Sequence, residues 1–212
     1  MIVSHERRLL FVHVQKTGGS SIDRVLESAL PDAARVQGLP GTRHAKLRAA
    51  LRAHPEYGDY FVLGFVRNPW ARLLSWHGMV IRRAAAAERG RREHVVKRFE
   101  ANNFWRTVAE EYPDFESFVL QGTREIPRLA TPQLDWLRAP GGRRADFIGR
   151  TENLADDLTA ALAQVGVELP VDALERRNAG PRADYRVAYS AAMRDRVAVV
   201  FADDIEEFGY TF

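Results

Sequence analysis

The stretch LLFVHVQKTGGSSIDRVLESAL, residues 9–30, decides the fold. Its first part, Leu9–Val14, is a short apolar run of the kind that forms a buried strand. Its last part repeats apolar side chains at helical spacing, from Ile22 through Leu26 to Leu30. A glycine turn joins the two. Strand, glycine turn and helix in this order are typical of an α/β fold.

Two later segments repeat the order of strand and then helix. The run at 60–66 is apolar throughout and leads into a helical pattern, for which Asn68 is a suitable N-cap and Pro69 a favoured first residue. Residues 146–150 form a second such strand, followed by apolar side chains at helical spacing over 154–165. Repeated strand–helix units predict a parallel sheet with crossover helices.

The rest of the chain reads mainly as helix. Residues 1–14 give a first strand, 45–53 a short helix and 190–202 a last helix. The segment of about 82–142 opens with a strongly charged run, which we interpret as a solvated helix face, and continues as helical pieces broken by prolines. We therefore predict one α/β domain over 1–212, with a short, mainly parallel sheet flanked by helices and a helical insertion.

Composition narrows the function classes. The chain has 212 residues, no cysteine and a net charge of +3, which excludes disulfides, thiolate metal sites and cysteine nucleophiles. So small a charge suits an anionic small ligand better than a nucleic-acid partner. No apolar run reaches the length of a membrane span, and the N-terminus lacks the pattern of a secretory leader, so we expect a cytoplasmic protein. Its oligomeric state stays open.

The glycine turn has the composition of an anion site. A turn between a strand and a helix presents backbone N–H groups and the positive end of the helix dipole. Here Lys16 supplies a cation, and Thr17, Ser20 and Ser21 supply hydroxyls. The lysine precedes the glycines, whereas a Walker A loop places it after them, so an ordinary nucleotide-triphosphate site is disfavoured. A plain strand–helix turn is the alternative.

A second polar pair follows the strand at 60–66. Arg67 stands at the end of that strand, where its planar group of donors would face the carboxyl edge of the sheet. Ser75 returns to the same side of the following helix two turns later. The pair could hold a second phosphate, although many helices begin after an arginine.

Taken together, these motifs resemble the sulfotransferases that use 3′-phosphoadenosine 5′-phosphosulfate (PAPS), a family of carbohydrate sulfotransferases and bacterial relatives with a P-loop NTPase-like fold. The resemblance covers nearly the whole chain and is weakest over 82–142. It rests on five segments: FVHVQKTGGSS (11–21), FVRNPWARLLSW (65–76), FIGRTENLADDL (147–158), RNAGPRADYRVAY (177–189) and FADDIEEFGYTF (201–212).

The resemblance implies a role for each matched position. Lys16 would stabilise the bridging oxygen of the leaving 5′-phosphate, and Arg67 with Ser75 would hold the 3′-phosphate. Arg182, in the later loop, would add a contact to the nucleotide. The residues expected around the 5′-phosphate are Lys16, Thr17, Gly18, Gly19, Ser20 and Ser21.

A general base is also needed to take the proton of the acceptor hydroxyl. By similarity to the family we assign it to His44, because histidine titrates near neutral pH. A surface histidine without a role is the alternative, and His13 reads as a core group. The implied activity is sulfuryl transfer from PAPS, without a metal, to a hydroxyl of a carbohydrate or other small acceptor. The alternatives are a nucleotide-dependent phosphotransferase and a non-catalytic nucleotide-binding protein.

Overall fold

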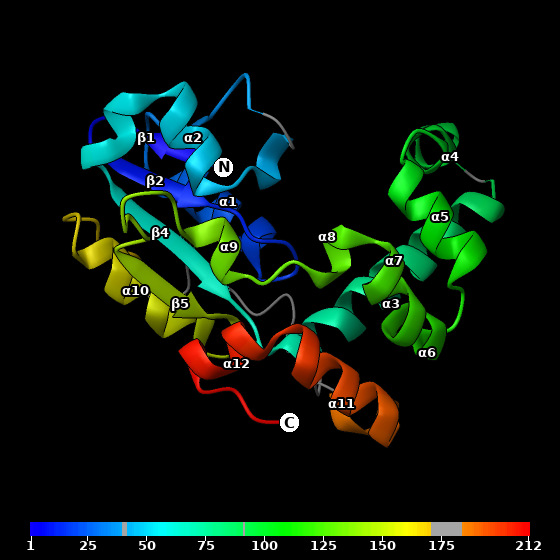
Figure 1. Cartoon of the computed structure of the whole chain (residues 1–212). Coiled ribbons are helices and arrows are strands. Elements are labelled where there is room, and N and C mark those ends of the chain that lie inside the picture. The colour runs from blue at the N-terminus through cyan, green and yellow to red at the C-terminus, as the bar shows by residue number, and fades with distance from the viewer. Residues whose placement is uncertain (40–41, 91, 171–183) are drawn as a thin grey trace. The chain divides into compact units, whose positions relative to one another are not determined.

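The computed structural model describes residues 1–39, 42–90, 92–170 and 184–212. The chain forms two compact units. The first unit comprises Met1–Arg67 and Gln133–Pro181, and the second comprises Asn68–Pro132 and Arg182–Phe212. The sheet lies in the first unit, and the second unit is helical (Figure 1).

Within the described residues, the sheet has five strands in the order β3-β1-β2-β4-β5. Its strands are β1 (Ile2–Ser4), β2 (Leu9–Val12), β3 (Ala34–Arg35), β4 (Phe61–Val66) and β5 (Phe147–Arg150). β2 pairs with β4 and β4 with β5 in parallel, whereas β1 is antiparallel to both of its neighbours. Four of the five strands therefore run in one direction, which confirms a mainly parallel sheet.

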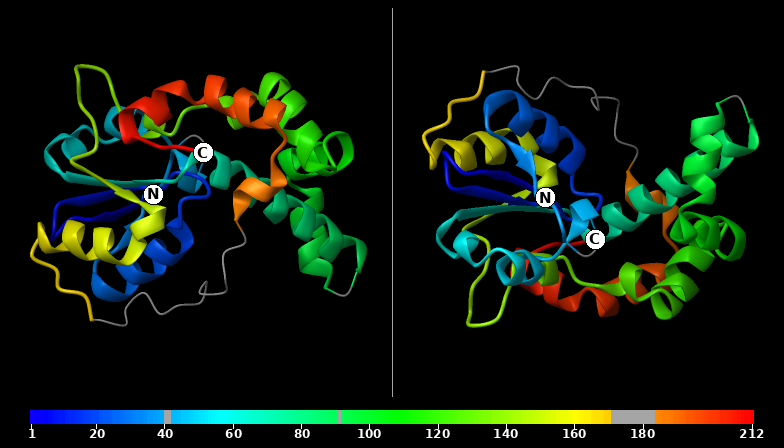
Figure 2. Two further views of the ribbon diagram at one scale, coloured as in Figure 1. Left: turned by 90° about the horizontal axis from the view of Figure 1, so that it is seen from below. Right: turned by 90° about the horizontal axis from the view of Figure 1, so that it is seen from above.

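Helices cover both faces of this sheet (Figure 2). Helices α1 (Gly19–Ala29) and α10 (Leu154–Ala163) cover one face, and α2 (Leu47–Ala53) and α9 (Leu134–Leu137) the other. Alternation along β4 explains the two layers, because Leu63 and Phe65 enter the core with α1 and α10, whereas the position between them faces α9. The core beneath α1 and α10 contains Ile2, Leu9, Phe11, Ile22, Val25, Leu26, Leu30, Leu63, Phe65, Leu158, Ala161, Leu162 and Val167.

Short turns complete the first unit. They are η1 (Thr42–His44), η2 (Pro55–Asp59) and η4 (Thr151–Asn153), all of the 3-10 type. The turn η1 precedes α2 and contains His44. The contacts that hold this turn therefore determine the position of His44.

The second unit begins with a long helix, α3 (Pro69–Glu88). As predicted, Asn68 is its N-cap, and its side chain accepts hydrogen bonds from the N–H groups of Trp70 and Ala71 at 3.1 and 3.3 Å. The other elements are α4 (Glu93–Glu100), α5 (Asn103–Glu111), α6 (Phe115–Ser117), the π-helical η3 (Phe118–Gly122), α7 (Thr123–Glu125), α8 (Pro127–Ala130), η5 (Tyr185–Ala188), α11 (Ala191–Val200) and α12 (Ala202–Phe208).

The structure confirms the α/β class and corrects two boundaries. The expected first strand is a hairpin, in which β1 and β2 pair across a turn at 5–8. The expected last helix ends at Val200, and α12 follows as a separate helix after Phe201. The segment 82–142 is largely helical as predicted, and its residues from 133 onward belong to the first unit. In the part of the chain that the structure describes, we find no helix with the length and apolar character to cross a membrane.

Candidate active site

The glycine turn and Arg67 meet at one edge of the sheet. β2 and β4 are parallel neighbours, with Val12 opposite Gly64, so the segments that follow both strands emerge together. As a result, the Arg67 side chain reaches the turn, and its Nη1 lies 3.5 Å from the carbonyl oxygen of Lys16. Two cationic residues from separate motifs thus share the carboxyl edge of adjacent strands.

The backbone of the turn explains its glycines. Lys16 has a φ of 69° and Gly18 a φ of 80°, so two residues of one short turn are left-handed. This conformation is unusual for lysine and is typical of functional sites. Gly19 is required for a different reason, because a Cβ there would lie 2.2 Å from Nε2 of His13. The start of α1 therefore packs directly against the His13 ring.

The hydroxyls of the turn are not equivalent. Thr17 is fully buried, and its hydroxyl donates to the carbonyl of Val14 at 3.0 Å, which stabilises the turn itself. Ser20 is exposed at the start of α1. The N–H of Ser21 donates to the Gly18 carbonyl at 2.8 Å, which is the first hydrogen bond of the helix. The N–H groups of Gly19 and Ser20 come before this bond, at the helix end where backbone N–H groups have no acceptor within the helix.

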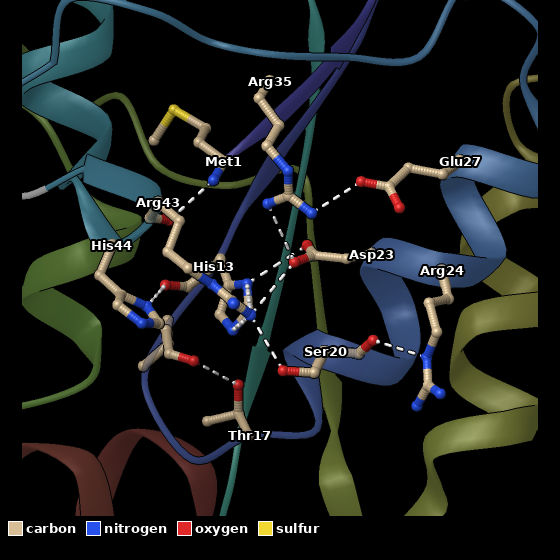
Figure 3. A network of polar contacts seen from close by, with 11 residues as sticks. Met1, His13, Thr17, Ser20, Asp23, Arg24, Glu27, Arg35, Arg43 and His44 are labelled. Carbon is tan, nitrogen blue, oxygen red and sulfur yellow. Dashed lines mark hydrogen bonds and ion pairs between the residues drawn. The ribbon is translucent and has the colours of Figure 1, made fainter. Parts of the chain in front are cut away.

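A buried carboxylate, Asp23, lies near the start of α1, close to His13, Arg35 and Arg43 (Figure 3). It accepts a hydrogen bond from Nδ1 of His13 at 3.2 Å and pairs with Nη2 of Arg43 at 3.2 Å and Nη1 of Arg35 at 3.3 Å. Burial alone would raise the pKa of Asp23, but the His13 hydrogen bond and the two guanidinium groups outweigh it and lower the pKa. Burial also lowers the pKa of His13, so a neutral imidazole faces an ionised carboxylate.

His44 is attached to the same strand end. Its Nδ1 lies 3.0 Å from the carbonyl oxygen of His13, and its ring stands edge-on to the His13 ring at 4.6 Å (Figure 3). A carbonyl can only accept, so Nδ1 carries the proton and Nε2 holds the lone pair in the neutral ring. The indole of Trp136 donates to the His44 carbonyl at 3.0 Å, which fixes the turn from α9.

The backbone of Arg67 is held by Gln133, a fully buried residue. The Gln133 side chain accepts from the Arg67 N–H at 2.9 Å and donates to the Arg67 carbonyl at 2.8 Å. The preceding carbonyl, that of Val66, accepts from the buried hydroxyl of Thr151 at 2.9 Å. The end of β4 is therefore fixed by side chains, which leaves the Arg67 guanidinium oriented toward the turn.

The predicted site residues are distributed unevenly. Lys16, the turn through Ser21, His44 and Arg67 all belong to the first unit. Ser75 belongs to the second unit, so its pairing with Arg67 stays a prediction. Arg182 lies outside the described residues.

Three residues of the site were missed from the sequence: Asp23, Arg43 and Gln133. Of the three, only Asp23 could have been found from the sequence, because it is a charged residue three positions before Leu26 on the apolar side of its helix. A carboxylate on a core face needs a buried partner. The other two act across long sequence separations, for which the sequence gives no pattern.

These features define a P-loop-like α/β protein with a cationic glycine turn at the carboxyl edge of its sheet. The sequence model of the Sulfotransferase family matches residues 1–211, and the chain belongs to that family. It is therefore a transferase of the sulfotransferase type. No curated protein and no solved structure matches the chain significantly.

Proposed function

We propose that this protein transfers the sulfuryl group of PAPS to a hydroxyl of a carbohydrate or other small acceptor, and releases adenosine 3′,5′-bisphosphate and a sulfate ester. The contacts at the end of β2 carry the proposal. The Arg67 guanidinium lies within 3.5 Å of the Lys16 carbonyl, and His44 is attached through His13 to the strand that leads into the same turn. Lys16, Arg67 and the proposed base His44 therefore belong to segments that meet at one strand end.

The chemistry of these residues suits this donor. A bisphosphorylated nucleotide is a polyanion, and the start of α1 offers N–H groups from Gly19 and Ser20 together with the helix dipole. Arg67 brings a guanidinium to this turn, and Lys16, a residue of the turn, supplies a second positive charge. In the proposed arrangement Lys16 and the turn hold the 5′-phosphate, whereas Arg67, Ser75 and Arg182 hold the remainder of the nucleotide.

In the proposed reaction, PAPS supplies the electrophilic sulfur and a stable phosphate leaving group. A sulfur–oxygen bond to the acceptor forms as the bond between sulfur and the bridging oxygen breaks. Lys16 stabilises the charge that develops on the bridging oxygen. His44 accepts the acceptor's proton on Nε2, since Nδ1 is committed to the His13 carbonyl.

The direct test is a transfer assay. Purified protein is incubated with labelled PAPS and a panel of hydroxyl compounds, and label transfer is read by mass spectrometry. Thermal shift separates the alternatives: stabilisation by adenosine 3′,5′-bisphosphate without metal supports the proposal, and a response only to Mg-ATP indicates a phosphotransferase. Nucleotide binding without any product across the panel would indicate a binding protein.

Lys16→Ala tests the role of the lysine. Turnover should fall by roughly 10²-fold or more, as when one donor to a developing oxyanion is removed, with folding retained. Lys97→Ala is a matched control, because Lys97 is an exposed surface lysine paired with Glu93. Near-normal turnover of Lys16→Ala would remove this lysine from the mechanism.

Arg67→Ala tests the second cation. Gln133 binds the backbone N–H and carbonyl of residue 67, so this substitution leaves those two hydrogen bonds in place. We expect the variant to bind the 3′-phosphorylated nucleotide much more weakly than wild type, but to lose little affinity for the analogue without the 3′-phosphate, as measured by calorimetry. Equal losses for the two nucleotides would show that Arg67 does not bind the 3′-phosphate.

A further inference from the structure

The residue next to the proposed base, Arg43, makes an unexplained contact with the glycine turn. Its Nη2 lies 2.9 Å from Oγ of Ser20 and 3.2 Å from Oδ2 of Asp23 (Figure 3). Nη2 carries two hydrogens, and these two oxygens are its closest acceptors; the ring nitrogens of His13 lie farther away, at 3.4 and 3.5 Å. Arg43 therefore bridges a buried carboxylate and an exposed hydroxyl at the start of α1.

The direction of the Ser20 contact is fixed by chemistry. A guanidinium has donors and no acceptor, so the serine oxygen must accept the bond. A hydroxyl that accepts from one side still has its own hydrogen to donate elsewhere. Ser20 is exposed, and the N–H groups of the first turn of α1 lie beside it. Its hydrogen is thus available to an anion at the glycine turn.

The guanidinium is itself held in place. Asp23 is 2% exposed and remains ionised, because its pKa is lowered once burial is outweighed by the His13 hydrogen bond and the charges of Arg43 and Arg35. A buried carboxylate constrains the Arg43 fork more strongly than a solvated one would. Arg35 pairs with the same carboxylate oxygen, and its second Nη bonds Glu27 at 2.7 Å, away from the turn.

We infer that Arg43 is a positioning residue for the sulfuryl donor: it holds the Ser20 hydroxyl as a hydrogen-bond donor toward the 5′-phosphate. This inference rests on the proposed function, since it assigns that phosphate to the turn. Arg43 acts through Ser20 and not as a direct ligand. Its contribution to nucleotide binding must therefore vanish when the serine hydroxyl is absent.

A double-mutant cycle tests this, with adenosine 3′,5′-bisphosphate as the probe and calorimetry as the readout. Ser20→Ala and Arg43→Gln should each weaken binding about tenfold, in line with the loss of a charge-supported hydrogen bond. The double variant should bind about as well as Ser20→Ala alone. A merely structural role for Arg43 would weaken binding equally in both backgrounds.

Two further variants sharpen the result. Arg35→Gln is the matched control, because Arg35 also pairs with Asp23 and its second Nη bonds Glu27 and not Ser20. The nucleotide affinity of this variant should stay within about threefold of wild type, as expected for the loss of a partly exposed ion pair. Arg43→Lys keeps a charge near Asp23 without the planar fork, and should bind as weakly as Arg43→Gln. Far-UV circular dichroism checks that each variant is folded.

The outcomes separate the two proposals. Wild type that fails to bind the nucleotide refutes the proposed function and, with it, this inference. If wild type binds the nucleotide, any one of three results would overturn the role of Arg43 alone. The two losses of affinity could add independently in the double variant, Arg43→Lys could keep full affinity, or Arg43→Gln and Arg35→Gln could lose affinity equally.

Discussion

Replacing Gly19 by alanine tests the packing beneath the turn. A Cβ at this position would lie 2.2 Å from Nε2 of His13, whereas ordinary contact begins at 3.4 Å. The ring would have to withdraw by about 1.2 Å, the difference between these distances. It is 3% exposed and bonded to Asp23 at 3.2 Å, so it cannot withdraw without losing that bond.

The cost follows from these contacts. Overpacking a core typically costs about 1–3 kcal/mol, and the lost hydrogen bond to a charged group about 1.5–3 kcal/mol. Alanine returns at most about 1 kcal/mol through its better helix propensity. We expect Gly19→Ala to lower the free energy of unfolding by about 2–5 kcal/mol, measured by urea denaturation followed through tryptophan fluorescence.

Two controls make the result specific. A Cβ at Gly58 would meet nothing within 4 Å, so Gly58→Ala should change stability by no more than about 0.5–1 kcal/mol. In a His13→Ala background the ring is gone, and Gly19→Ala should then cost little. Wild-type stability of Gly19→Ala, or the same loss in both backgrounds, would refute this account of the turn.

Two other predictions concern the groups that support the site. The pKa of Asp23 is lowered from 3.8 in the folded state, so its ionised form adds stability above pH 3.8, and this stability is lost as the pH falls through the folded pKa. The difference in unfolding free energy between wild type and Asp23→Asn should therefore shrink as the pH is lowered below 3.8. A constant difference would contradict an ionised Asp23 in the folded protein. Gln133→Ala should destabilise the protein by about 2–5 kcal/mol, since it removes two hydrogen bonds to the partly buried backbone of Arg67 and empties a fully buried site. The exposed Gln164→Ala should cost about 0.5 kcal/mol or less. Similar denaturation midpoints for the two variants would count against a stabilising role of Gln133 at the end of β4.

The sequence predicts the parts of the fold that local chemistry determines. The strand at 61–66, the Asn68 cap and the proline at the start of α3 are all present, because an apolar run and a capping side chain act over a few residues. The hairpin between β1 and β2 was missed, since its turn contains neither glycine nor asparagine and instead places Arg8 at a φ of 47°. The break at Phe201 also occurs without proline or glycine.

The candidate site also combines features that local sequence patterns predict with contacts that they do not. The parallel pairing of β2 with β4 brings the segments after both strands together, and Nη1 of Arg67 lies 3.5 Å from the Lys16 carbonyl oxygen. The contacts that orient them are non-local: Arg43 reaches Ser20 across 23 residues, and Gln133 reaches Arg67 across 66. Side chains so distant in sequence come together only through the packing of whole elements, which periodicity and motif spacing do not encode.

The attachment of His44 has a consequence for how that ring handles charge. Its Nδ1 hydrogen bond to a carbonyl survives in both ionisation states, because a neutral ring and an imidazolium each present a hydrogen there. Gaining or losing a proton therefore alters only the opposite nitrogen and demands no rotation of the ring. The histidine can pass through a complete cycle of ionisation while its anchor to the main chain stays unbroken.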